Sequence, residues 1–142
     1  MNIIWKRPDG GVSVTHVSGE MNDSELREHA EELKALGSIP EDYELVAIAI
    51  TLPESREWRE AWSWTTPDPV IDICPAKAKE VTKDRLRRER APLLQALDVQ
   101  FQRNLETGTD NTEVVTEKNR LRDITKLADA AASLDDLKAL AP

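Results

Sequence analysis

The segment that most constrains the fold runs from Pro75 to about Glu106, where the sequence predicts one long helix. Proline is favoured at the first position of a helix, because no backbone N–H is needed there, and Pro75 suits that position. Pro92 lies inside the segment and removes the hydrogen bond to the carbonyl of Arg88, so we expect a kink. Larger side chains recur at steps of three and four, which is the spacing of one helical face: Leu86, Arg90, Leu93, Leu97, Phe101 and Leu105.

A second helix is expected at 111–127, after a break at "TGTD". Asp110 followed by Glu113 matches a capping box, in which two side chains satisfy free amides at a helix start. One face of this helix carries Val114, Lys118, Leu121 and Thr125. We expect the two helices to fold back as an antiparallel hairpin. A third box, Ser133 with Asp136, predicts a short helix near the C-terminus.

The first half of the chain shows strand patterns around one helix. Two β-branched runs, 2–7 and 11–17, flank "PDGG", whose glycines supply the positive φ angles of a tight hairpin. Asn22 and Glu25 form a capping box for a helix at 23–36, which Gly37 ends. The alternating run 43–52 predicts a strand that pairs with the hairpin.

These elements predict an α+β fold in two parts. A small antiparallel β module with one helix occupies residues 1–73 and includes a short strand at 70–73, "VIDI". A long kinked helix and an antiparallel helical hairpin occupy residues 74–142. The length of 142 residues is compatible with one module followed by a helical arm.

Charge is divided unevenly between the two halves. Residues 1–70 hold six basic and fourteen acidic residues, which accounts for the whole net charge of −8. Residues 77–90 carry seven cations and three anions. An acidic chain repels nucleic acid at long range, so we expect no nucleic-acid partner and prefer contact between the basic segment and an acidic neighbouring subunit. No run approaches the roughly 18 apolar residues of a membrane span, so no membrane partner is expected.

The sequence offers no set of residues typical of catalysis or cofactor binding. Cys74 is the only cysteine, and the interpretation as a structural residue outweighs that as a nucleophile. His16 and His29 lack the paired spacing of metal ligands. "PDGG" lacks the context of a phosphate loop. The acidic series Glu54, Glu57 and Glu60 is typical of a solvated helix face. We therefore expect no enzymatic activity, no metal and no cofactor.

Three of the four tryptophans lie within "REWREAWSW", at 56–64. Ser55 caps an expected helical turn that brings Trp58 and Trp62 together at i, i+4. In one interpretation these two indoles seal the first module against the start of the long helix. In the other the tryptophans form a docking patch, made by Trp64 with Trp5, since indoles are frequent anchors at interfaces. Trp64 is expected on the side of its strand opposite to Trp58 and Trp62.

A basic cluster on the long helix is the other candidate for partner binding: Arg85, Arg87, Arg88 and Arg90. Such arginines suit an acidic partner surface. The alternative is that they solvate the helix and pair with neighbouring carboxylates, namely Glu80, Asp84 and Glu89.

The order of these segments resembles a family of small tail-region proteins of tailed bacteriophages and prophages. The resemblance rests on "IIWKRPDGGVSV", "REWREAWSW", "VIDICPAKAKEVTKDRLRRERAPLLQALDVQFQRNLETG", "KNRLRDIT" and "LDDLKAL". It covers most of the chain and is strongest from Trp58 to Thr125. The helical hairpin ending in "RLRDIT" is similar, more loosely, to the C-terminal part of phage tail-fibre assembly proteins. The chain departs at "LKALAP", where such proteins tend to place a tryptophan before the proline.

The resemblance implies a virion structural protein at the tail tip, in the baseplate or on a fibre, made in the host cytoplasm and located in the tail. Its expected partners are other tail, baseplate or fibre proteins and further copies of itself. A tail-fibre assembly chaperone is the alternative, and it would leave the particle after assembly. A small enzyme or DNA-binding regulator is the third interpretation, which the charge and the lack of catalytic residues disfavour.

Overall fold

The computed structural model describes residues 1–65 and 70–142. The chain divides into two compact units, Met1–Cys74 and Pro75–Pro142, one residue away from the expected boundary. The fold is mixed α+β, with 54% of the described residues in helices and 17% in strands, and the α+β class agrees with the sequence patterns. None of the helices in the described part of the chain is long and apolar enough to cross a lipid bilayer.

The N-terminal unit is built on a three-stranded antiparallel sheet in the order β2-β1-β3. The strands are β1 (Asn2–Lys6), β2 (Val12–His16) and β3 (Glu44–Ile48), so all three expected strands are confirmed. Gly10 turns the β1–β2 hairpin with a φ of 74°, a conformation that few residues other than glycine adopt. The Asp9 carboxylate accepts a hydrogen bond of 2.9 Å from the amide of Gly11 and fixes the same turn.

Helix α1 (Asp23–Ala35) packs on one face of this sheet. Its predicted capping box is confirmed, because Asn22 accepts from the Glu25 amide at 3.1 Å while Glu25 accepts from the Asn22 amide at 2.7 Å. Gly37 follows the helix with a φ of 69°, as expected of a residue that ends a helix. The core on this side of the sheet consists of Ile3, Trp5, Val17, Leu26 and Ala30.

The opposite face of the sheet is covered by a second hairpin, β4 (Trp62–Thr65) with β5 (Val70–Ile73). Ile4 and Val12 point to this side and form a core with Trp62 and Ile71. A shift of register between Ile4 and Trp5 lets adjacent residues of β3, Val46 and Ala47, both pack against this core. The unit is therefore three layers: a helix, a three-stranded sheet and a two-stranded hairpin.

The prediction of a helical turn that contains both Trp58 and Trp62 is wrong. The segment forms a short 3₁₀ helix, η1 (Arg59–Ala61), and Trp62 already begins strand β4. Trp64 follows two residues later in the same strand, so it lies on the same face as Trp62 and packs against the same core. The expectation that Trp64 stands on the opposite side is therefore also wrong. A strand repeats its faces every two residues, whereas the expectation assumed a helix that ended between the two tryptophans.

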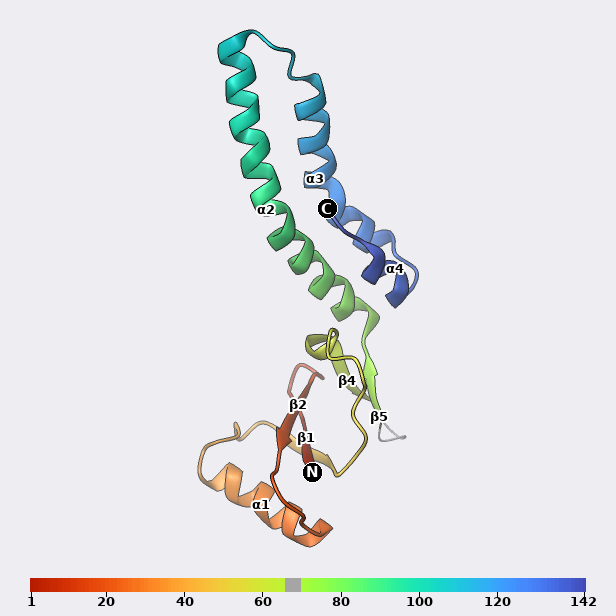
Figure 1. The fold of residues 1–142 in the computed structure, drawn as a ribbon. Helices are drawn as coiled ribbons and strands as arrows, with labels where there is room; N and C mark the ends of the chain where they lie inside the picture. Colours follow the sequence, from red (N-terminus) through yellow and green to blue (C-terminus); the bar gives the residue numbers. More distant parts are fainter. Residues whose placement is uncertain (66–69) are drawn as a thin grey trace. The chain divides into compact units, whose positions relative to one another are not determined.

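The C-terminal unit is a helical hairpin with a short third helix. Helix α2 (Pro75–Thr107) begins at Pro75, as predicted, and continues as one helix through Pro92. Helix α3 (Thr112–Ala130) runs back along α2, which confirms the antiparallel hairpin (Figure 1). Helix α4 (Leu134–Ala139) carries the predicted capping box of Ser133 and Asp136.

The capping box expected from Asp110 and Glu113 does not form. Asn111 is the residue before α3, and its side chain makes no capping hydrogen bond to the helix. Instead the side-chain nitrogen of Asn111 donates to the carbonyl of Phe101 at 3.2 Å. The side-chain oxygen of Asn111 accepts from the side-chain nitrogen of Asn104 at 3.0 Å. Asn111 thus binds the end of α2, and the bond to the neighbouring helix replaces the local cap.

Candidate protein-interaction site

Arg85, expected in the basic patch, binds the C-terminal segment of its own chain. Its Nη2 atom donates to the carbonyl oxygens of Leu137 at 3.2 Å and Leu140 at 2.8 Å. These carbonyls lie at the end of α4, where helical carbonyls lack amide partners and carry partial negative charge. The Nη1 atom lies 3.4 Å from the Glu89 carboxylate, the pairing foreseen in the alternative interpretation.

Arg90 is occupied in the same way. Its Nη1 atom donates to the carbonyls of Leu121 at 3.1 Å and Arg122 at 2.7 Å, in the middle of α3. Arg85 and Arg90, two of the four arginines considered for contact with an acidic partner, are therefore occupied within their own chain. Both join α2 to the segments that pack on it, a role that spacing along α2 alone could not reveal.

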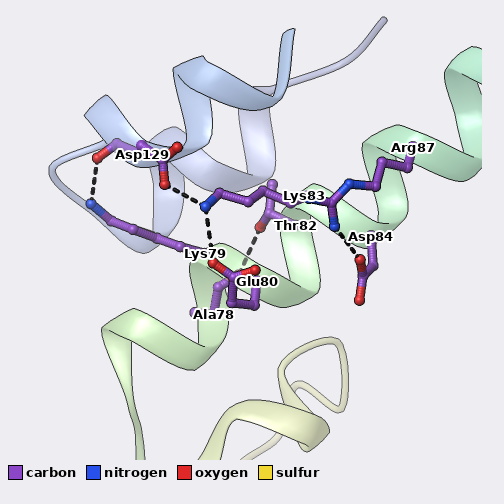
Figure 2. Close-up of polar contacts among 8 residues, drawn as sticks. All are labelled: Ala78, Lys79, Glu80, Thr82, Lys83, Asp84, Arg87 and Asp129. Carbon is purple, nitrogen blue, oxygen red and sulfur yellow. Dashed lines mark hydrogen bonds and ion pairs between the residues drawn. The ribbon is translucent and has the colours of Figure 1, made fainter. Parts of the chain in front are cut away.

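Two lysines of the basic segment converge on the end of α3 (Figure 2). Lys79 donates to the backbone carbonyl of Asp129 at 2.7 Å, and Lys83 lies 2.5 Å from the Asp129 carboxylate. Lys83 also donates to Glu80 at 2.9 Å. Hydrogen bonds to Asp129 and then to Glu80 raise the pKa of Lys83 above its usual value, because both carboxylates stabilise the charged amine. Lys79, Lys83 and Asp129 could not be grouped from the sequence, since no local spacing relates α2 to α3.

Arg87 and Arg88 remain on the exposed side of α2. The Arg87 guanidinium pairs with Asp84 at 2.6 Å, one helical turn away (Figure 2). In the part of the chain that the structure describes, no ion pair or hydrogen bond involves the Arg88 side chain. Arg88 is therefore the member of the predicted cluster that is available to a partner.

The prediction that Trp5 and Trp64 form a docking patch is wrong for Trp5. Trp5 has no exposed surface, and its Nε1 donates to the Thr15 hydroxyl at 3.0 Å. Trp5 packs in the core beneath α1, whereas Trp64 packs on the opposite face of the sheet, so the two indoles cannot share a surface. Trp64 is half-buried. Trp58 and Trp62 are buried, at 3% and 2% exposure.

The distal half of the helical hairpin has almost no core. Across residues 87–120, all of which the structure describes, Val114 is the one buried side chain. Polar contacts hold the two helices together here, including an ion pair of 2.6 Å between Lys118 and Asp98. Lys118 also lies 5.0 Å from the centre of the Phe101 ring. Four aliphatic side chains in this half are more than 40% exposed: Leu93, Val99, Leu105 and Val115.

The hollows in the helical unit are small or open. A cavity of about 250 Å³ lies below the usual range of about 300–1,000 Å³ for ligand pockets; it is lined by Pro75, Lys79, Ala131, Ala132, Ser133, Leu134 and Leu137. An open groove beside the distal loop contains Asp110, Glu113 and Glu117. Within residues 1–65 and 70–142, no group of three or more His, Cys, Asp or Glu side chains could hold a metal ion.

The arrangement thus offers surfaces for protein contact: the exposed side of α2 with Arg88, and the thinly packed distal half of the hairpin. Sequence reasoning missed the second surface, although a signal was present. Residues 91–102 hold a single charged residue, Asp98, in a chain of which 32% is charged. Comparison with protein-family models, with curated proteins and with solved structures found no match to this chain.

Proposed function

We propose that this chain is a structural protein of a bacteriophage tail, located at the tail tip, in the baseplate or on a fibre, and that it acts through protein–protein contacts. The resemblance in the segments from "REWREAWSW" to "KNRLRDIT" supplies the biological setting. The observation that carries the contact role is the distal half of the hairpin, where one buried side chain accompanies four exposed aliphatic ones.

A pair of helices normally draws its stability from an apolar face buried against other elements. The distal half of α2 and α3 has few apolar side chains to bury between the two helices, and it leaves Leu93, Val99, Leu105 and Val115 in water. A neighbouring subunit that covers these side chains would supply the missing burial.

The same surface would serve a tail-fibre assembly chaperone, which holds a fibre end and then departs. Mass spectrometry of purified particles of the encoding phage distinguishes the two functions. A structural subunit is retained at a fixed ratio to the other tail proteins. A chaperone is absent from the particle, although its deletion leaves fibres unassembled. Absence from the particle together with normal particles after deletion would overturn both functions.

A pair of variants tests the surface itself. Leu105→Lys places a charge on a side chain that is 64% exposed in the distal half, and we expect it to reduce incorporation into particles without changing the helix content. Leu127→Lys is the matched control, because Leu127 is 54% exposed on α3 beyond that half. Equal incorporation of both variants at the level of the unmodified chain would contradict the role of the distal half.

A further inference from the structure

Helix α2 carries a regular stripe of exposed residues on the side away from α3. Its members are separated by alternating steps of four and three, which place them along one face of a helix: Arg88, Pro92, Gln95, Val99, Gln102 and Glu106. All six are exposed, and Val99 at 51% is the aliphatic member. The less exposed residues of α2 belong to other positions, among them Leu86, Leu97 and Phe101. We call the six residues the outer stripe.

The centre of the outer stripe is free of charge. Asp98 is the one charged residue between positions 91 and 102, and its carboxylate is held by Lys118 at 2.6 Å. Charged residues are depleted at the cores of protein interfaces, because removing a charge from water is costly. Pro92, Gln95, Val99 and Gln102 can therefore be covered by a partner without burying an unpaired ion.

The two ends of the outer stripe carry opposite charges. Arg88 and Glu106 are both exposed, and neither forms an ion pair or a hydrogen bond through its side chain to any residue in 1–65 or 70–142. The stripe is also symmetric about Leu97: positions 88 and 106 are nine residues from it, 92 and 102 are five, and 95 and 99 are two. An antiparallel copy of α2 therefore presents the same spacing with the charges reversed.

We infer that α2 of one chain pairs antiparallel with α2 of a second copy, across a twofold axis at the level of Leu97. In this dimer Arg88 faces Glu106 of the second copy, Pro92 faces Gln102 and Gln95 faces Val99, and each pair occurs twice because a twofold interface is self-complementary. A parallel pairing would instead place Arg88 against Arg88 and Glu106 against Glu106, which is unfavourable. The charge pattern therefore selects a second copy and the antiparallel direction.

Pro92 gives the pairing a further polar contact. Since proline has no N–H, the carbonyl of Arg88 lacks its donor within the helix. The antiparallel register places Gln102 of the second copy opposite Pro92, beside that carbonyl. A glutamine amide there can donate the missing hydrogen bond. This inference rests on the proposed function, which is contact with other proteins, because it identifies a second copy of the chain as one partner of the helical arm.

The test is the association of the full purified chain, followed by analytical ultracentrifugation over a concentration series. We expect a monomer–dimer equilibrium that weakens as salt is raised. Arg88→Glu and Glu106→Arg each turn two attractive pairs into two repulsive ones, so each variant alone should dimerise at least about tenfold more weakly. The two variants mixed one to one should form a heterodimer, because their charges are then complementary at both ends. The double variant should regain the dimer.

Arg27→Glu is the matched control, since it makes the same change of charge at an exposed position of α1, and it should dimerise like the unmodified chain. Val99→Asp tests the centre of the stripe independently and should weaken the dimer with unchanged helix content. A chain that stays monomeric at all concentrations, or single charge variants that associate normally, would overturn the inference. Retention in tail particles is measured separately, so a monomeric protein found in particles would refute the dimer and leave the proposed function standing.

Discussion

The ammonium group of Lys83 lies 2.5 Å from the carboxylate of Asp129, and this ion pair joins the early turns of α2 to the last turn of α3. The Lys83 side chain is 15% exposed, whereas the Asp129 side chain is 61% exposed, so the pair lies at the edge of the helical packing. Lys79 reaches the backbone carbonyl of the same aspartate at 2.7 Å. One acidic residue near the chain's end thereby fixes two turns of α2.

Lys83→Met should loosen the end of α3 and lower the melting temperature by roughly a few degrees. The raised pKa of Lys83 determines how the stabilisation by this ion pair depends on pH. The stabilisation is complete below the unfolded pKa of about 10.5 and is lost as the pH rises through the higher pKa of the folded chain. Thermal melts of the two proteins should therefore differ at pH 7 and converge only after the pH has risen through the folded-state pKa of Lys83, which lies above 10.5. Lys126→Met, which removes an exposed pair with Asp123, is the control and should have little effect.

The capping box of α4 should lose its stabilising effect at low pH, whereas the Lys83 pair loses its effect at high pH. The Ser133 hydroxyl and amide bind the Asp136 carboxylate and lower its pKa below the usual value of 3.8. The cap is therefore intact above pH 3.8 and fails as the pH falls through the lower pKa of the folded chain. At pH 7, Ser133→Ala should speed amide hydrogen exchange in α4 roughly fivefold. Exchange in α4 that is equally slow in Ser133→Ala would show that tertiary contacts alone hold this helix.

Local sequence signals predicted most elements of the fold. The capping boxes at Asn22 and Ser133 and the proline at position 75 marked helix ends correctly, because the interactions involved are within four residues of one another. The capping box predicted at Asp110 was wrong because the side chain of the next residue, Asn111, donates to a carbonyl of α2. The sequence does not show which helix an asparagine will bind. Trp62 was misplaced because a 3₁₀ turn and an α-helical turn share the same local signals.

The candidate site was predictable only in part. The arginine cluster was recognised, yet Arg85 and Arg90 bind carbonyls more than thirty residues away, a relation that no local pattern contains. The outer stripe of α2 was not recognised from the sequence, although its centre lies in a charge-poor segment of a highly charged chain. Its exposure, however, depends on which side of α2 receives α3, and that is decided by packing between the two helices.

Arg85 and Arg88 should differ sharply when each is replaced by glutamine. Arg85→Gln removes two hydrogen bonds to carbonyls of the C-terminal segment, and we expect a loss of about 1–2 kcal/mol in the free energy of unfolding, since the side chain is partly exposed. Arg88→Gln should change it by less than about 0.5 kcal/mol. Urea unfolding followed by circular dichroism measures both. Equal losses would mean that the contacts of Arg85 to Leu137 and Leu140 contribute nothing to stability.

The tryptophans of β4 give the last prediction. Trp62 is 2% exposed and packs with Ile4, Val12 and Ile71, so Trp62→Ala should destabilise the N-terminal unit by about 3–5 kcal/mol. Trp64 lies on the same face but is half-buried, so Trp64→Ala should cost roughly 1–2 kcal/mol. Amide signals of β1 in the full chain, followed through urea unfolding by NMR, report this unit separately from the helices.

Trp5→Phe provides the comparison for the other face of the sheet. It keeps an aromatic ring beneath α1 and removes the hydrogen bond to Thr15, so we expect a loss of about 1–2 kcal/mol. If Trp64→Ala proved as damaging as Trp62→Ala, the edge of the β4–β5 hairpin would be as essential to the core as its centre. If Trp62→Ala left the β1 signals stable, Trp62 would contribute little to the layer that covers Ile4, and the assignment of this core would be wrong.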